Sequence, residues 1–197
     1  RGLGDVYKRQ LISVIRVVSK EGASIFDFAR LVPIGRGSNL KKQMLGPHEY
    51  RMLLYKVLEE YKRLQDTGCR THFGRKDNLW KLLYKELGLF RAPPGSESNN
   101  LIYSGCMIGV NVLVILADGT VLPCRRLPIP IGRVPNQSIR DIFINSPILN
   151  EMRKVEQMVK CGKCDLLRFC RGCPAVAYAV YGDWRAPDPQ CWRRLKS

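Results

Sequence analysis

Residues 161–191 read CGKCDLLRFCRGCPAVAYAVYGDWRAPDPQC and contain five of the eight cysteines in the chain. These lie at Cys161, Cys164, Cys170, Cys173 and Cys191, in the spacing C-x2-C-x5-C-x2-C-x17-C. A C-x2-C pair lets two thiolates from one tight turn reach the same metal. Two such pairs, with a further cysteine downstream, supply enough sulfur for one complete metal site and part of a second. The stretch therefore predicts metal or cluster binding rather than unpaired core cysteine.

The rest of the composition indicates a reducing compartment. The 197 residues allow one ordinary domain or two small ones. No secretory apolar segment precedes the cysteines, and C-x2-C pairs suit metal better than small-loop disulfides. The longest apolar run, residues 110–117, is far too short to span a bilayer. We therefore expect a soluble cytoplasmic protein without a membrane partner.

The chain is strongly basic, with 33 Lys and Arg against 17 Asp and Glu and a formal net charge of +16. Such a charge is typical of proteins that bind nucleic acid or acidic peptides. However, bound metal would bring thiolate charge that this sum omits, and the basic residues are scattered along the sequence. The charge alone does not predict a nucleic-acid partner.

The first half of the chain shows helix and strand patterns. Residues 1–10 (RGLGDVYKRQ) have no apolar periodicity and resemble a translated adapter scar, so we exclude them from the fold and expect the natural protein to begin further upstream. Residues 11–19 indicate a helix, residues 24–32 a short buried strand and residues 33–37 a loop. A second helix is expected over residues 48–64, where apolar residues share one face. This order is typical of one slice of an α/β layered fold.

A linker divides the sequence. Asp77 or Asn78 can cap a helix over residues 79–87. Residues 91–100 (RAPPGSESNN) are rich in Pro, Ser and Asn. We therefore expect three segments, a scar over residues 1–10, an α/β segment over 11–95 and a cysteine-rich domain over 96–197.

The second half begins with a hairpin signal. Residues 111–117 and 120–124 are β-rich runs on either side of Asp118-Gly119, which predicts a type I′ turn. The hairpin would bring Cys106 and Cys124 to one end. Ser138 can then cap a short helix, and Pro147 opens another that we expect to reach about residue 159.

Seven cysteines follow the linker, whereas two closed four-thiolate sites need eight. We expect one complete site and one three-thiolate site, unless Cys69 crosses the linker. Asp118 and Asp165 are candidate oxygen ligands, although a role in the turn or toward the solvent explains both residues better. Cys69 near His72 is more typical of packing than of a metal site.

The cysteine pattern resembles a known family. The motif C-x12-G-x4-C at Cys106, Gly119 and Cys124, then C-x2-C-x5-C-x2-C and a last cysteine, is similar to the SPASM domain of radical S-adenosylmethionine (SAM) enzymes. The resemblance covers residues 101–197. The segments FARLVPIGRG and LGPHEYRMLLYKVLEEY look like the last strand–helix units of a radical SAM barrel. The resemblance implies an α/β remnant of a partial TIM barrel followed by a small α+β SPASM domain.

In that family the domain holds auxiliary [4Fe-4S] clusters. By motif position, one ligand set would be Cys161, Cys164, Cys170 and Cys191, and the other Cys106, Cys124 and Cys173. Two features depart from the family pattern. Many members have C-x3-C where this chain has C-x2-C at Cys170, and some have a further cysteine just before the first one. The second difference leaves the eighth ligand unassigned.

The family motif C-x3-C-x2-C, which holds the SAM-cleaving cluster, is absent from this chain. The resemblance therefore implies a C-terminal fragment that is inactive alone, from a parent enzyme with SAM and a third [4Fe-4S] cluster. Residues 30–33 would edge the SAM pocket. Expected partners are a peptide, protein or small-molecule substrate, and an electron donor such as ferredoxin or flavodoxin. The auxiliary clusters would relay electrons or anchor substrate.

Two other interpretations of the function stay open. The first is a zinc-binding, Cys-rich adaptor module that contacts nucleic acid or protein, although Cys106 and Cys124 would lie on hairpin strands rather than in a zinc knuckle. The second is a ferredoxin-like electron carrier. The gap of five residues after Cys164 breaks the ferredoxin spacing.

Overall fold

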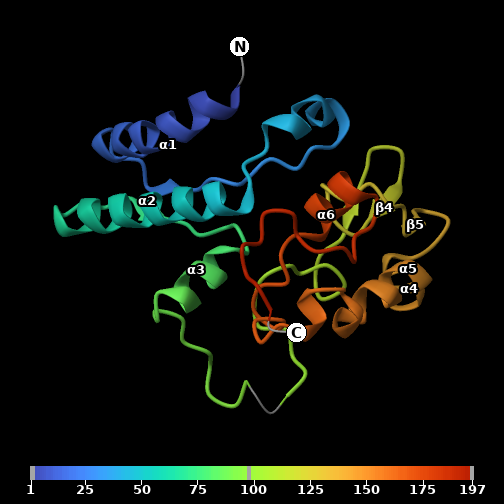
Figure 1. Cartoon of the computed structure of the whole chain (residues 1–197). Coiled ribbons are helices and arrows are strands. Elements are labelled where there is room, and N and C mark those ends of the chain that lie inside the picture. Colours follow the sequence, from blue (N-terminus) through green and yellow to red (C-terminus); the bar gives the residue numbers. More distant parts are fainter. Residues whose placement is uncertain (1–2, 97–98, 196–197) are drawn as a thin grey trace. The chain divides into compact units, whose positions relative to one another are not determined.

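The computed structural model describes residues 3–96 and 99–195, with side chains from residue 10 onward. Its internal contacts divide the chain into two compact units. Unit 1 comprises Arg1–Phe90 together with Pro189–Arg194, and unit 2 comprises Arg91–Asp188 with Leu195–Ser197. The colours of Figure 1 follow the chain through both units. Within the described residues, no helix combines the length and apolar character needed to cross a membrane.

Unit 1 is a small α/β unit. Its helices are α1 (Leu3–Lys20), α2 (Pro47–Asp66) and α3 (Trp80–Glu86), with a 3-10 segment, η1 (Gly35–Gln43), between the first two. Strand β1 (Ile25–Phe26) pairs in parallel with β2 (His72–Phe73).

The core of unit 1 is aromatic and lies against α2. Tyr50, Leu54, Val57 and Tyr61 recur at helical spacing on α2 and are buried, as the apolar pattern predicts. The Tyr61 ring stacks on Phe73, with ring centres 4.2 Å apart.

Three expectations for unit 1 need correction. The strand expected over residues 24–32 is paired only at Ile25–Phe26, because β2 offers a partner of only two residues. The loop expected over residues 33–37 instead leads into η1 from Gly35 onward. Helix α1 also begins at Leu3, so most of the segment that we excluded from the fold is helical. The origin of residues 1–10 stays a prediction.

A charged network joins α1 to α2. Arg16 donates two hydrogen bonds to the Glu60 carboxylate, at 2.9 and 3.0 Å, and Arg63 donates another at 2.6 Å. These bonds lower the pKa of Glu60, a buried residue, from 4.5 to about 2. The carboxylate therefore stabilises unit 1 only while it is ionised.

We expect Glu60→Gln to lower the free energy of unfolding at pH 7 by about 1–3 kcal/mol, since both arginines lose their counter-charge. In the unmodified chain this contribution is complete above pH 4.5 and is lost as the pH falls toward 2, because the unfolded state takes up the proton first. Urea unfolding at several pH values measures both effects. Glu59→Gln, at an exposed position on the same helix, is the control. Equal stability of the two variants would contradict the prediction.

Unit 2 contains a three-stranded antiparallel sheet and several short helices. The sheet order is β3 (Val114–Ile115), β4 (Thr120–Leu122) and β5 (Gly132–Arg133). The helices that follow are α4 (Ile139–Asn145), α5 (Pro147–Arg153), η2 (Val155–Gln157), η3 (Cys161–Lys163) and α6 (Pro174–Tyr181). Val121, Ile131, Ile142 and Leu149 form the core between sheet and helices.

The predicted hairpin is present, but its turn differs. Ile115 pairs with Val121, and Leu116 donates its amide to Thr120 at 2.8 Å, which leaves three residues in the loop. Only Gly119 has a positive φ, of 84°, whereas a type I′ turn needs two such residues. Asp118 instead accepts hydrogen bonds from the amide and hydroxyl of Thr120, at 2.9 and 3.0 Å. The loop therefore has three residues instead of two, and the positive φ expected at both Asp118 and Gly119 is found only at Gly119.

The helices of unit 2 agree in part with expectation. Ser138 caps α4 by accepting a hydrogen bond from the Asp141 amide at 3.0 Å, as predicted. The helix expected to reach residue 159 ends at Arg153, because Lys154 leaves the helical region with a ψ of 63°. The chain then turns through η2, which places the Glu156 carbonyl against the first C-x2-C pair. Helix α6 was not predicted.

Candidate functional site

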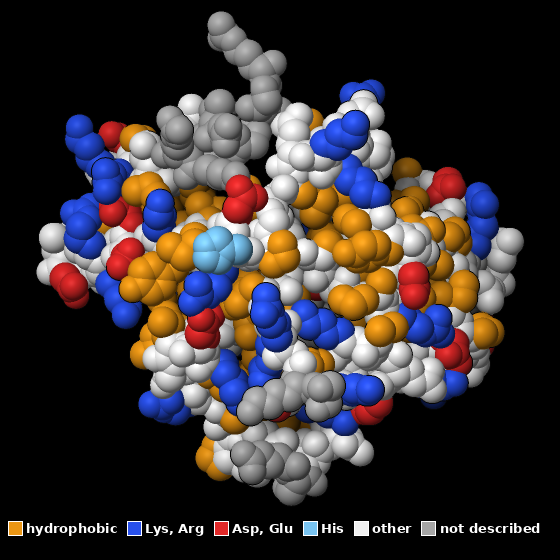
Figure 2. Space-filling model, in the orientation of Figure 1, with side chains coloured by type: hydrophobic (Ala, Val, Ile, Leu, Met, Phe, Trp, Pro, Cys, Tyr) orange, Lys and Arg blue, Asp and Glu red, His pale blue; other side chains and the backbone are white. Residues whose placement is uncertain are grey.

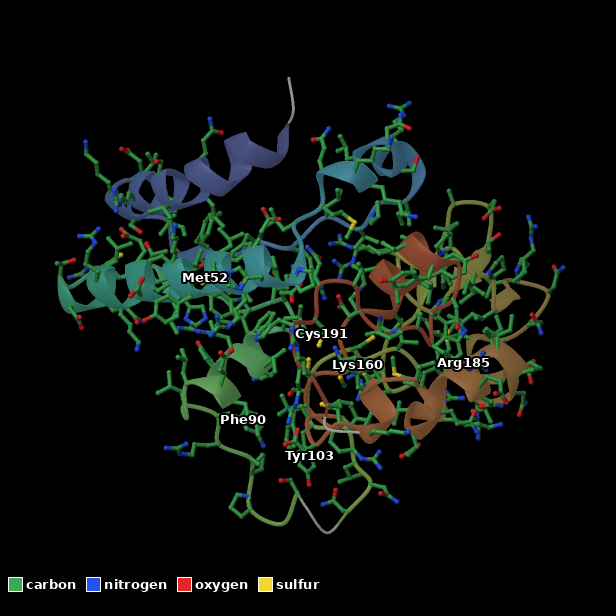
Figure 3. All side chains as sticks on the ribbon, viewed as in Figure 1. Met52, Phe90, Tyr103, Lys160, Arg185 and Cys191 are labelled. Carbon is green, nitrogen blue, oxygen red and sulfur yellow. The ribbon has the colours of Figure 1, made fainter. Side chains whose placement is uncertain are left out.

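The segment before Cys106 is bonded to the segment before Cys170. The amides of Tyr103 and Ser104 donate to the Arg168 carbonyl, at 2.9 and 3.3 Å, and the Ser104 hydroxyl donates to the Phe169 carbonyl at 2.9 Å. Tyr103, labelled in Figure 3, also stacks its ring on Phe169 with centres 5.4 Å apart. Two distant parts of the sequence are therefore fixed side by side.

Gly105 makes this approach possible. Its φ is +90°, and a Cβ there would lie 2.5 Å from the Cys170 carbonyl oxygen and 2.8 Å from that of Phe169. Real Cβ atoms do not approach backbone oxygens so closely, so only glycine fits. Gly105 therefore packs against the backbone of Cys170, and this fixes the position of the next residue, Cys106.

Cys106 interacts electrostatically with Cys124 and Cys173. The pKa of the Cys106 thiol is raised to about 11, mainly by burial and also by the charges of Cys173 and Cys124. The Ile108 amide and Arg171 act in the opposite direction. Like-charged thiolates oppose ionisation in such a place unless a cation joins them. Cys106 thus interacts with the two other cysteines of the second predicted ligand set, and their role as ligands stays a prediction.

The first C-x2-C pair occupies one tight turn. The Cys164 amide donates to the Cys161 carbonyl at 3.0 Å, which closes η3. A Cβ at Gly162 would lie 2.1 Å from the Glu156 carbonyl oxygen, so the turn is pressed against η2. The Cys164 thiol also lies 3.8 Å from a carboxylate oxygen of Asp165. This is the local geometry that lets two sulfurs face one site.

The second C-x2-C pair has an unusual backbone. Arg171 and Gly172 both have positive φ, of 57° and 58°. A Cβ at Gly172 would lie 2.6 Å from the Asp188 Cβ, and Asp188 accepts a hydrogen bond from the Cys173 amide at 2.8 Å. Cys173 is also the N-cap of α6, whose dipole favours a thiolate.

Two amide-to-sulfur hydrogen bonds prepare thiolates for ligation. Gly172 donates its amide to the Cys170 sulfur, and Arg126 donates its amide to the Cys124 sulfur, each at 3.5 Å. Hydrogen bonds to ligating sulfur are among the features that tune an iron–sulfur site. They were not visible in the sequence, since both depend on local turn geometry.

One buried cation lies among these cysteines. Arg171 is 4% exposed, and its Nη1 atom has no hydrogen-bond partner. Burial lowers its pKa, whereas the charges of Cys106, Cys170 and Cys161 raise it. A buried cation with an unused N–H, beside several thiols, fits a sulfur-ligated group of net negative charge. The residues present therefore fit an iron–sulfur cluster.

The remaining predicted residues lie elsewhere. Cys191, labelled in Figure 3, belongs to Pro189–Arg194 of unit 1, so its place in a ligand set stays a prediction. Cys69 is also in unit 1, where hydrogen bonds with Thr71 lower the pKa of its thiol. Asp118 is engaged in the hairpin turn. Across residues 3–96 and 99–195, no three His, Cys, Asp or Glu side chains are arranged around a single metal ion.

Unit 1 also contains a largely apolar cavity of about 520 Å³. Arg30 and Leu31, within the stretch predicted to edge a SAM pocket, form part of its wall. The Arg30 guanidinium is held by Asp77, with 2.8 Å between Nε and Oδ2, and donates to Gln190 at 3.2 Å.

On the face shown in Figure 2, Lys and Arg are spread among acidic and apolar side chains.

Comparison with known proteins agrees with this site. Residues 106–174 match the SPASM family, an iron–sulfur cluster-binding domain. The chain is 29% identical over 193 residues to the AdoMet-dependent heme synthase of Methanosarcina barkeri, covering 94% of this chain and 54% of that protein. It is 28% identical over 182 residues to the enzyme of that name from Nitratidesulfovibrio vulgaris, covering 90% and 48%. It is also 24% identical over 197 residues to the Fe-coproporphyrin III synthase of Methanosarcina barkeri, covering 93% and 49%.

The chain spans about half the length of the curated relatives that it matches. The resemblance to radical SAM enzymes with a SPASM domain is confirmed by the family match and by these relatives. The chain carries an iron–sulfur cluster-binding domain.

Proposed function

We propose that this chain, a member of the radical SAM/SPASM family, is the auxiliary-cluster part of an enzyme that modifies a tetrapyrrole by radical chemistry. The observation that carries the proposal is the match of residues 106–174 to an iron–sulfur cluster-binding domain, and the interaction of Cys106 with Cys124, Cys173 and a buried arginine supports it. The relatives support the substrate class, because their names describe synthesis of heme and of Fe-coproporphyrin III.

Two [4Fe-4S] clusters are proposed, one with four cysteine ligands and one with three and an unassigned fourth ligand. Cys161, Cys164 and Cys170, with Cys191, would hold one, and Cys106, Cys124 and Cys173 the other. When bound, such clusters accept and pass single electrons. The backbone of unit 2 contributes the amide bonds to sulfur and the tight turns that orient the thiolates.

The remaining activity belongs to the whole enzyme. The C-x3-C-x2-C motif for the SAM-cleaving cluster does not occur in this sequence, so SAM cleavage would need residues outside it. The α/β unit 1 would form part of a partial barrel, with the cavity beside Arg30 at the SAM or substrate side. An electron donor such as ferredoxin or flavodoxin would reduce the clusters.

Metal analysis of the full chain after anaerobic iron–sulfur reconstitution tests the proposal. We expect iron and sulfide for about two cubane clusters per chain, with a broad visible band near ~400 nm. Cys161→Ser and Cys106→Ser should each lose about one cluster, because each removes a ligand from a different set. Cys69→Ser is the matched control and should keep both.

Other results separate the alternatives. Tight zinc without sulfide would overturn the proposal in favour of a zinc-binding adaptor. For the substrate class, the full chain is titrated with Fe-coproporphyrin III, and we expect a shift of the porphyrin absorption band. A titration without any shift would remove the tetrapyrrole from the proposal and leave the cluster assignment standing.

A further inference from the structure

Arg171 stands in a costly backbone conformation. Its φ of 57° makes it the only residue other than glycine with a positive φ in the described parts of the chain. Side chains with a Cβ rarely adopt this region, because the Cβ meets the carbonyl oxygen. Gly172 next to it adopts the same region without that penalty. The sequence therefore retains a strained arginine where a glycine would fit more easily.

The strained residue carries a buried charge. Arg171 is 4% exposed, and the described residues offer it no ion pair with a carboxylate. Its Nη1 atom is enclosed without a hydrogen-bond partner. A buried guanidinium without a counter-charge is strongly unfavourable in the protein alone. Such an arrangement becomes favourable only when an anionic group is present.

The small cavity beside Arg171 is lined by apolar side chains and sulfur. A cavity of about 10 Å³, roughly the room of one water, is lined by Arg171 and Cys106 with Met152, Met158 and Trp184. Interactions between charges are stronger in such surroundings than in water. The guanidinium is therefore placed to act on charges at the cysteines.

The cysteines that act on Arg171 belong to both predicted ligand sets. Cys161 and Cys170 come from one set, and Cys106 comes from the other. Four thiolates more than offset the positive charge of a [4Fe-4S] core, so each fully ligated cluster is an anion. One cation that interacts with cysteines of both sets is shared between two anionic groups.

We propose that Arg171 is the shared counter-charge of the two clusters and donates its unused N–H to cluster sulfur, as a positioning residue that raises their reduction potentials. This inference rests on the proposed function, since it requires clusters at these cysteines. A nearby cation favours the reduced, more negative state of a cluster, and net charge and hydrogen bonds to sulfur are among the factors that set its potential.

The test is a redox titration of the reconstituted full chain, followed by electron paramagnetic resonance. We expect Arg171→Met to lower the equilibrium constant for one-electron reduction of both clusters at least tenfold, which is about 59 mV for each. Arg171→Lys keeps the charge but loses the planar fork of donors, so its shift should be smaller. Arg168→Met removes a nearby arginine that is already paired with Glu156, and serves as the matched control.

A second variant separates charge from backbone strain. Arg171→Gly removes the charge and also relieves the positive φ. Potentials that fall in both Arg171→Met and Arg171→Gly support the counter-charge. Potentials that fall in Arg171→Met and are unchanged in Arg171→Gly would overturn it, because both variants lose the charge.

Stability gives a readout that does not depend on redox chemistry. Without clusters, Arg171→Met should be at least as stable to urea as the unmodified chain, because it removes an unpaired buried charge. With clusters it should be less stable, or should lose iron faster to a chelator. Destabilisation of equal size in both states would overturn the inference. If the unmodified chain takes up no iron and sulfide, the proposed function fails; if it does and the Arg171 variants match it, only this inference fails.

Discussion

Gly105→Ala is expected to destabilise unit 2 by about 3 kcal/mol and to remove the cluster at Cys106. The new Cβ would lie 2.5 Å from the carbonyl oxygen of Cys170 and 2.8 Å from that of Phe169, both backbone atoms that a side-chain rotation cannot move away. The segment from Tyr103 to Cys106, which is hydrogen-bonded to residues 168–170, would have to move away from them. Urea unfolding and iron analysis measure the two effects.

Gly182→Ala is the matched control for this variant. Gly182 has a similar positive φ, of 76°, but nothing lies within 4 Å of a Cβ built there. The free energy of unfolding of the Gly182→Ala protein should therefore fall by only about 1 kcal/mol, the cost of a positive φ for alanine, and the protein should keep its iron. A Gly105→Ala protein with the stability and iron content of Gly182→Ala would show that the close approach to Cys170 is not required.

Removal of the clusters is expected to loosen unit 2 and leave unit 1 largely intact. The strands of unit 2 are two or three residues long, so few ladder hydrogen bonds hold it without metal. Thiolates from separated segments would be joined by each cluster, and the binding energy of such a group is also folding energy. Unit 1 has its own core, in which Tyr61, Phe73 and Trp80 stack.

Hydrogen exchange followed by mass spectrometry measures this result on the full chain, before and after oxidative cluster removal with a chelator. We expect amides of residues 101–188 to lose protection by at least about 100-fold, or about 2.7 kcal/mol. Helices α2 and α3 should change little. Unchanged protection in residues 101–188 would contradict the coupling of cluster to fold, and equal loss in both units would contradict their independence.

The sequence predicted those elements that depend on short-range signals. Helix α2 is given by its apolar stripe, and the cap of α4 by Ser138. The hairpin was found from Asp118-Gly119, but its turn was not. Asp118 bonds to Thr120 instead of adopting a positive φ, and one more residue enters the loop. Turn type depends on register, which a dipeptide does not specify.

The parts that were missed depend on long-range contacts. The strand expected over residues 24–32 shortens to Ile25–Phe26 because its only described partner is two residues long, nearly fifty positions away. The family resemblance implied Cys106, Cys124 and Cys173 as one ligand set, and in the structure the charges of Cys124 and Cys173 act on Cys106. Spacing gave no sign of Arg171, because the burial of an arginine between two cysteines follows from packing and not from pattern.

The return of Pro189–Arg194 to unit 1 has a consequence for the order in which the protein is made. Gln190 accepts a hydrogen bond from Arg30 at 3.2 Å and donates one to the Leu45 carbonyl at 3.0 Å, across about 150 residues of sequence. During translation, residues 91–188 are synthesised before this segment. Unit 1 therefore gains its last contacts only after most of the sequence of unit 2 has been made.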